Sequence, residues 1–245
     1  LSMTRATERW HKRMEKKVVD DASVVVAVSP LVQQEFQAMT QTPVELITNG
    51  FDECDFPSGR YVEADGGPDK DFVITHTGLF AADGNPTTLW KVLADKCRSN
   101  EAFAKALKIK LVGKTDKQIV ESIEAVGLGN SLVDMGYQPH AEAIEQQRRA
   151  SLLILPLRKE PEYKAVLPGK LFEYLASWRP VLGIGQTDGA MSMILNSTKT
   201  GLVLDWEDEA SISRFIELGW KNQLAANLAV EDADISQFTR KELTR

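Results

Sequence analysis

The sequence is poor in cysteine and histidine. Its two cysteines, Cys54 and Cys97, are far apart and lack the spacing of metal ligands. We therefore expect two free thiols in a reducing compartment and no disulfide. The three histidines are His11, His76 and His140, and no carboxylates accompany them at the spacing of a metal site. We expect neither a metal ion nor another cofactor.

The sequence also lacks a long apolar run and an excess of basic residues. No apolar stretch approaches the roughly 20 residues that cross a bilayer. Residues 1–20 are charged where a signal peptide would be apolar. With 43% hydrophobic and 26% charged residues, the composition is typical of a protein that folds in water. The net charge of -6 argues against broad nucleic-acid binding. We expect a cytoplasmic protein.

Positive charge is concentrated near the N-terminus, in a segment that we expect to be helical. A basic helix can lie on an anionic membrane surface, which predicts peripheral membrane contact. The other interpretation is an ordinary solvated helix face, since Glu8 and Glu15 are interleaved with the cations. Both interpretations stay open. The basic residues are Arg5, Arg9, Lys12, Arg13, Lys16 and Lys17.

A β-α-β unit is predicted after this helix. Val24–Val28 is an apolar, β-branched run, typical of a parallel strand that is buried on both faces. Ser29 is a good N-cap and Pro30 suits the first helical position, so a helix should extend to Met39. Val44–Ile47 is the next strand.

A domain boundary is predicted after this unit. Asn49-Gly50 breaks the strand, and residues 52–70 are rich in glycine and proline with little periodicity. We therefore predict one domain over residues 1–57 and a second over residues 58–245.

The second domain is predicted to be a doubly wound α/β domain of the Rossmann-like type. Six apolar, strand-like runs alternate with helix-like stretches, which predicts a parallel sheet with helices on both faces. Ligands of such sheets bind in the strand-to-helix loops. The six runs are Phe72–Thr77, Ile109–Val112, Leu132–Met135, Leu152–Leu155, Val181–Ile184 and Leu202–Leu204.

The most informative segment is Val166–Ala176, which follows a strand and begins a helix. A helix N-terminus has free amide donors and partial positive charge, and Lys170 in the first turn adds a full charge, which together suit a diphosphate. Glu173 lies on the same helix face and could accept hydrogen bonds from ribose hydroxyls. The alternative is a simple Lys-Glu surface pair.

This segment resembles the donor-site helix of the retaining glycosyltransferases of family 4, whose motif reads roughly S/G-K-x-x-E-Y-L-A followed by a Pro-Val strand. Gly169–Ala176 and Pro180-Val181 match this motif. Other family-like segments follow in the expected order, and the resemblance covers essentially the whole chain. They are Val24–Ser29, Leu46–Asp52, Thr77–Phe80 with Asn85-Pro86, Leu111–Gly113, Gly136–His140 and Thr200–Val203.

The resemblance implies a GT-B fold and transfer of a sugar, with retention, from a UDP or GDP sugar to a glycan or lipid-linked acceptor. The chain would hold the donor-binding lobe and only the end of the acceptor lobe, so we expect it to bind donor without turnover. The implied diphosphate contacts are Gly78, Gly169 and Lys170, the ribose contact is Glu173, and Tyr137 and Gln138 lie in the loop that meets the base.

The sequence departs from the family pattern at two places. Many members have a glutamate eight positions before Glu173, where this chain has Ala165. The loop after Gly78 lacks the usual arginine and lysine, so compensating contacts could come from Lys114, Arg158 or Lys164, each of which could instead be a solvated loop cation. His76, at the end of a strand before Gly78, could approach a ligand or be a buried histidine with its hydrogen bonds satisfied. These departures leave open a catalytically silent nucleotide-sugar-binding module. A nucleotide-sugar epimerase on the same fold is a further alternative.

Overall fold

The computed structural model describes residues 4–56, 71–224, 228, 230 and 233–245. The chain divides into two compact units, Leu1–Asn49 and Gly50–Arg245, which are described separately below. The domain boundary predicted between residues 57 and 58 lies outside the described residues. Among those residues, no helix is both long enough and apolar enough to cross a membrane.

The first unit contains the predicted β-α-β arrangement, preceded by a helix. Its elements are α1 (Arg5–Asp21), β1 (Val25–Ala27), α2 (Pro30–Met39) and β2 (Val44–Leu46). The two strands are parallel, with Val25 opposite Val44. Ser29 caps α2 as predicted, because its hydroxyl accepts a hydrogen bond from the Val32 amide at 3.4 Å.

The prediction that Val24–Val28 is buried on both faces is wrong. Ala27 is buried, whereas Val24, Val26 and Val28 are 48, 51 and 55% exposed. Alternate residues of a strand point to opposite faces. Helix α2 contacts both strands, and the described residues of this unit supply no second layer over the face that carries the three valines.

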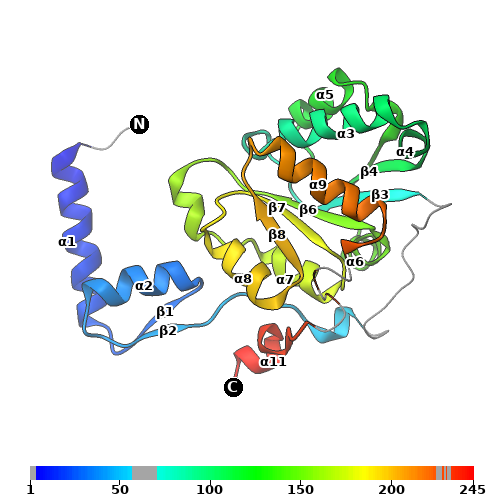
Figure 1. The fold of residues 1–245 in the computed structure, drawn as a ribbon. Helices are drawn as coiled ribbons and strands as arrows, with labels where there is room; N and C mark the ends of the chain where they lie inside the picture. The colour runs from blue at the N-terminus through cyan, green and yellow to red at the C-terminus, as the bar shows by residue number, and fades with distance from the viewer. Residues whose placement is uncertain (1–3, 57–70, 225–227, 229, 231–232) are drawn as a thin grey trace. The chain divides into compact units, whose positions relative to one another are not determined.

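The second unit is built on a six-stranded parallel sheet, as predicted (Figure 1). The strand order is β5-β4-β3-β6-β7-β8, so the direction of winding reverses between β3 and β6. Every residue of β3 is buried, as expected for a strand covered on both faces. The strands are β3 (Phe72–Thr77), β4 (Leu107–Val112), β5 (Leu132–Gly136), β6 (Leu152–Pro156), β7 (Val181–Ile184) and β8 (Gly201–Leu204).

Helices connect these strands. The α-helices are α3 (Thr87–Ser99), α4 (Glu101–Ala106), α5 (Lys117–Ala125), α6 (His140–Arg149), α7 (Gly169–Ala176), α8 (Ala190–Thr198), α9 (Glu209–Trp220) and α11 (Arg240–Leu243). The short 3₁₀ helices are η1 (Glu53–Asp55), η2 (Ala82–Gly84), η3 (Gly129–Ser131), η4 (Pro161–Ala165) and η6 (Ser236–Phe238). Asp116 caps α5, because its carboxylate accepts a hydrogen bond from the Gln118 amide at 2.9 Å.

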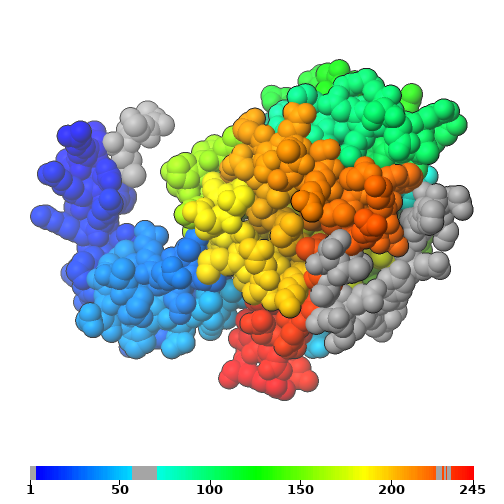
Figure 2. All heavy atoms as spheres, viewed as in Figure 1, coloured from blue at the N-terminus to red at the C-terminus, as the bar shows by residue number. Residues whose placement is uncertain are grey.

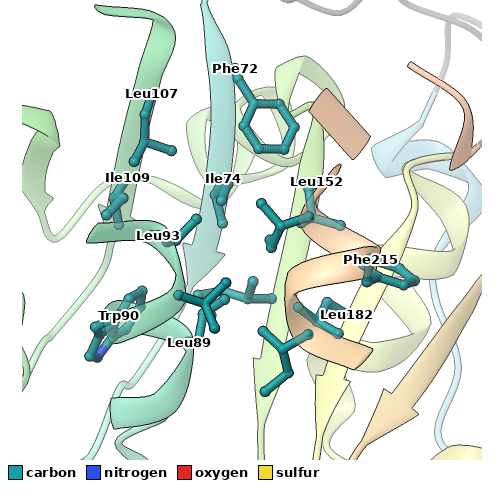
Figure 3. Packing of buried hydrophobic residues seen from close by; sticks show 14 of the residues in the cluster. Phe72, Ile74, Leu89, Trp90, Leu93, Leu107, Ile109, Leu152, Leu182 and Phe215 are labelled. Atoms are coloured by element: carbon teal, nitrogen blue, oxygen red, sulfur yellow. The ribbon is translucent and has the colours of Figure 1, made fainter. Parts of the chain in front are cut away.

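The main hydrophobic core lies between the sheet and helices α3 and α9. Leu89, Trp90 and Leu93 of α3 pack with Phe215 of α9 over strand residues such as Ile74 (Figure 3). The two helices also contact each other, and the surfaces of α9 (orange) and the α3–α5 region (green) meet in the space-filling view (Figure 2). This core fixes the sheet whose loops carry the candidate site.

The C-terminal segment pairs with the start of the second unit. The Phe51 amide donates to the Phe238 carbonyl at 3.0 Å, and the Arg240 amide donates to the Phe51 carbonyl at 2.9 Å. Glycine is required at position 50, because a Cβ there would lie 2.4 Å from the Phe238 carbonyl oxygen.

Candidate functional site

The candidate site lies where the winding of the sheet reverses, at the carboxyl ends of β3 and β6. Gly78 follows β3, and its φ of 85° is a left-handed conformation that favours glycine. Its amide donates to the Val112 carbonyl at 2.7 Å. Helix α7, which begins at Gly169, comes after β6. Parallel α/β sheets bind ligands at this kind of position.

The Lys170 side chain reaches from the first turn of α7 to the loop after β3. Its Nζ donates to the Leu79 carbonyl at 3.1 Å and lies 3.2 Å from the His76 Nε2. A Cβ added at Gly78 would lie only 3.4 Å from the same Nζ. The structure therefore brings together three predicted site residues, His76, Gly78 and Lys170.

The contact between Lys170 and His76 requires a neutral imidazole. Burial holds the pKa of His76 well below its ordinary value, and the positive charge of Lys170 lowers this pKa further. The Nε2 atom can then accept a hydrogen bond from the ammonium, which places the imidazole proton on Nδ1. Nδ1 is buried without a hydrogen-bond partner, and Phe80 stacks on the ring at a centroid distance of 4.1 Å.

Burial also changes the titration of Lys170. It lowers the pKa of the ammonium to about 8, against the opposing effect of the Glu173 charge. Within the described ranges, no carboxylate forms an ion pair with Lys170, and its two close partners are neutral groups. The cation is therefore partly desolvated without a counter-charge in contact.

Glu173, one turn further along α7, has a different set of partners. Its Oε2 accepts a hydrogen bond from the Gln147 Nε2 at 3.0 Å, and the same nitrogen donates to the Thr77 hydroxyl at 3.1 Å. The Tyr174 hydroxyl accepts from the Thr77 amide at 2.8 Å. The simple Lys-Glu surface pair is therefore not what the structure shows, because the two side chains have separate partners.

Gln147 and Tyr174 were not predicted as site residues. Gln147 lies on α6 in the run Glu145-Gln146-Gln147-Arg148-Arg149, which has the composition of a solvated helix face. Its three-residue spacing from Ile144, which is also buried, is the one signal that could have indicated burial. Tyr174 was visible only as part of the family motif, and burial raises its pKa to about 12.

Solved structures with this fold include several glycosyltransferases. HepE from Anabaena, in complex with UDP-glucose, is 17% identical with a TM-score of 0.63, and the match covers 95% of this chain and 66% of HepE. Sucrose-phosphate synthase from Thermosynechococcus elongatus is 17% identical with a TM-score of 0.68, over 99% of this chain and 61% of the synthase. WaaG, a glycosyltransferase involved in lipopolysaccharide biosynthesis, is 14% identical with a TM-score of 0.61, over 89% and 61%. The chain has a GT-B-type fold.

The likeness to GT-B proteins is one of structure. No protein-family model and no curated protein sequence matches the chain. The chain spans between 61 and 66% of the length of the three proteins named above. At these identities the comparison shows the GT-B fold.

Three further cations were predicted as possible site residues, and two of them form ion pairs elsewhere in the second unit. The Arg158 Nε pairs with Asp83 at 2.8 Å, and the Lys164 Nζ pairs with Asp188 at 2.5 Å. The Lys114 side chain is exposed in the loop after β4, and its carbonyl accepts a hydrogen bond from the Phe80 amide at 2.9 Å. Arg158 and Lys164 therefore have their own counter-charges, unlike Lys170.

The predicted base loop after β5 presents one free side chain and one that is tied to the backbone. Tyr137 is 86% exposed, which leaves its ring available for stacking. The Gln138 amide donates to the Met135 carbonyl at 2.7 Å and so stabilises the turn.

His140 begins α6 and joins this helix to the start of the second unit. Its Nε2 lies 3.0 Å from the Asp55 carboxylate. The hydrogen bond to Asp55 raises the pKa of His140 against the opposing effect of burial, and the charges of Glu173 and Asp55 add to the rise. In the described parts of the chain, no three His, Cys, Asp or Glu side chains form a group that could hold a metal ion.

Proposed function

We propose that the chain binds the nucleoside diphosphate of a sugar donor at the carboxyl ends of β3 and β6. The diphosphate lies against Gly78, Gly169 and Lys170, and Glu173 accepts hydrogen bonds from the ribose. The observation that carries this proposal is the Lys170 ammonium, which is half-buried beside the Gly78 loop with His76 and Leu79 as neutral partners.

An ammonium in this position favours an anionic ligand. Burial destabilises the ammonium form of Lys170, because it removes water from the charge. A diphosphate in contact would stabilise the ammonium again through charge-assisted hydrogen bonds. The free amides at the N-terminus of α7 add partial positive charge on the same side. In a transfer reaction these groups would stabilise the charge that grows on the departing diphosphate.

The finer parts of the proposal are a UDP or GDP sugar as donor, a glycan or lipid-linked acceptor, and retention at the anomeric carbon without a metal. HepE was solved with UDP-glucose, and the pneumococcal O-GlcNAc transferase GtfA, another structure of similar fold, was solved with UDP and GlcNAc. UDP is therefore the first ligand to test. Acceptor binding would need surfaces beyond the second unit.

A calorimetric titration with UDP, GDP and ADP tests this proposal. We expect one diphosphate to bind more tightly than its nucleoside, with equal affinity in magnesium and in a chelator. Glu173→Ala should weaken binding of the diphosphate and of the nucleoside by the same factor, since both carry the ribose. Equal affinity for diphosphate and nucleoside in the unaltered chain would contradict the proposal.

A second candidate is a nucleotide-sugar-binding module without catalysis. The chain has Ala165 where many family members have a glutamate, and the loop after Gly78 lacks their two cations. Arg158 and Lys164 could replace those cations, but they already pair with Asp83 and Asp188, which favours a module without catalysis. Release of UDP from a bound UDP-sugar separates the candidates, since a silent module keeps the sugar intact. Interconversion of two sugar isomers would instead favour an epimerase.

We also propose that α1 makes peripheral contact with an anionic membrane from a cytoplasmic location. Trp10, Met14 and Val18 follow one another at four-residue spacing and are 57, 45 and 68% exposed. They form an apolar stripe beside the basic residues of the same helix, a pattern typical of interfacial helices. Two of the cations, Lys12 and Lys16, pair with Glu8 and Asp20, as the solvated-face interpretation also predicts.

A further inference from the structure

Gln147 is a fully buried polar side chain that contacts Glu173 of the candidate site. It lies on α6, with none of its surface exposed. Its Nε2 donates one hydrogen bond to the Thr77 hydroxyl at the end of β3 and one to the Glu173 carboxylate on α7. One amide nitrogen therefore connects three elements, α6, β3 and α7.

The orientation of this amide follows from the chemistry of its neighbours. An ionised carboxylate only accepts hydrogen bonds, so the NH₂ group of Gln147 has to face Glu173. The Oε1 atom then points away and is buried without a hydrogen-bond partner. A buried acceptor without a partner is unfavourable for stability. The arrangement gives Glu173 a hydrogen bond and leaves one Gln147 acceptor unpaired, which is rare enough in folded proteins to call for an explanation.

The Thr77 end of this connection is also fixed. The Thr77 amide donates to the Tyr174 hydroxyl, and the Thr77 hydroxyl lies 3.3 Å from the same oxygen. Tyr174 and Thr77 are both buried. Glu173 and its neighbour Tyr174 are thus both tied to the end of β3, one residue before the Gly78 loop.

Only one of the two Glu173 oxygens takes part in these contacts. Oε2 accepts from Gln147, and among the described residues no hydrogen bond or ion pair involves Oε1. The side chain is half-buried, so it is not enclosed by its neighbours. A carboxylate held through one oxygen keeps a defined rotamer and presents the other oxygen to a ligand.

We infer that Gln147 is a positioning residue for the ribose specificity of this site, which holds the Glu173 carboxylate so that its free oxygen accepts from ribose hydroxyls. This inference rests on the proposed function, since it assigns the partner of Glu173 to the ribose. Gln147 itself touches no ligand. Its effect should therefore appear in the preference for ribose over deoxyribose and not in the response to the diphosphate.

The test compares UDP with 2′-deoxy-UDP, and UDP with uridine, by calorimetric titration of the full chain and of Gln147→Met. Methionine fills a similar volume and removes both the donor and the unpartnered oxygen. We expect the ribose preference to fall about tenfold, the size typical of a charge-assisted hydrogen bond. The gain of UDP over uridine, which depends on Lys170, should stay unchanged.

Two further variants make the result specific. Glu173→Ala should lose the ribose preference, and adding Gln147→Met to it should cause no further loss, because the two residues act as one unit. Gln147→Glu keeps the shape but brings a second carboxylate to Glu173, so the ribose preference should fall at neutral pH and return in part at low pH. Circular dichroism and the melting temperature show whether each variant is folded. If Gln147→Met does not fold, the ribose preference of Gln147→Glu provides the test.

The outcomes separate this inference from the proposed function. Preference for ribose in the unaltered chain together with the same preference in a folded Gln147→Met variant overturns the positioning role alone. No preference for ribose in the unaltered chain overturns the ribose assignment of Glu173 and this inference with it. Loss of ribose preference in Gln147→Met, without loss in the diphosphate response, supports both.

Discussion

Lys170 and His76 are two basic side chains in hydrogen-bond contact, an arrangement that is stable because the imidazole is neutral. The sequence indicated both residues, and it indicated Glu173 through its spacing from Lys170. It did not indicate that Lys170 would lie against His76 and Glu173 against Gln147. Such contacts depend on how α6, β3 and α7 come together in space, which no local pattern in the sequence specifies.

The titration of Lys170 predicts how diphosphate binding depends on pH. Burial lowers the pKa of the free side chain to about 8, so the unliganded chain loses the ammonium as the pH rises through this value. A diphosphate binds the ammonium and raises its pKa. UDP affinity should therefore be highest below this pH and fall by up to about tenfold per pH unit well above it. Titrations of UDP over this range check the prediction.

Uridine and the Lys170→Met variant are the controls for this pH dependence. Uridine lacks the diphosphate, and the variant lacks the titrating amine, so neither affinity should change as the pH rises from neutral through the pKa of Lys170, a range below the ionisation of the uracil N3–H. At a pH just above the pKa of Lys170 in the unliganded chain, UDP binding should also take up a proton. Calorimetry in two buffers of different ionisation enthalpy detects this uptake. A UDP affinity that stays constant through this range would count against the role of Lys170.

His76→Phe tests the neutral acceptor beneath the Lys170 ammonium. Phenylalanine keeps the stacking with Phe80 but removes the Nε2 acceptor, so the ammonium loses one of its two hydrogen-bond partners. UDP affinity at neutral pH should fall about two- to tenfold, as for loss of one ordinary hydrogen bond. Uridine affinity should not change, and an equal loss for UDP and uridine would instead indicate a general distortion of the loop.

At the scale of the elements, the sheet of the second unit was predictable to within a few residues. Phe72–Thr77 and Val181–Ile184 are strands with the predicted bounds, because strands buried on both faces appear in the sequence as short apolar runs. The same reasoning failed for Val24–Val28, where one face is open. An apolar run shows that a strand can be buried, and the layer that covers it has to come from elsewhere.

Helix α3 should contribute strongly to stability through its packing on the sheet and on α9. Leu93 of α3 is fully buried in the main core. Leu93→Ala should lower the free energy of unfolding of the second unit by about 2–5 kcal/mol, the range for a buried leucine that leaves a cavity. Chemical denaturation measures this change. Leu79→Ala, at a 64% exposed leucine, is the matched control and should change stability little.

Helix α1 allows a test of membrane contact. We expect the chain to sediment with vesicles that contain anionic lipid and not with neutral vesicles, because its cations would lie near the lipid surface. Arg9→Gln and Arg13→Gln should each weaken binding about fivefold, since one cation near an anionic surface contributes about 1 kcal/mol. Equal binding to neutral and anionic vesicles, or none to either, would favour the solvated-face interpretation.

At the scale of the whole molecule, the fold accounts for the position of the site. The strand order β5-β4-β3-β6-β7-β8 places the loops after β3 and β6 side by side, and these are the loops that carry Gly78 and lead into α7. The sequence predicted the parallel sheet and its helices, and the resemblance predicted the GT-B type. Strand order itself was not readable from local patterns, because it depends on long-range pairing such as that of Ile74 with Leu152.

Comparison of Lys170→Met with Lys117→Met is the sharpest test of whether Lys170 binds the diphosphate of a nucleotide sugar. Lys117 also lies in the first turn of a helix, but it is exposed and pairs with Glu121, so it controls for the loss of one positive charge. We predict that Lys170→Met removes most of the difference between UDP and uridine affinity, at least tenfold by the strength of a charge-assisted contact, while Lys117→Met leaves it intact. An unchanged difference in a folded Lys170→Met variant would show that Lys170 does not bind the diphosphate.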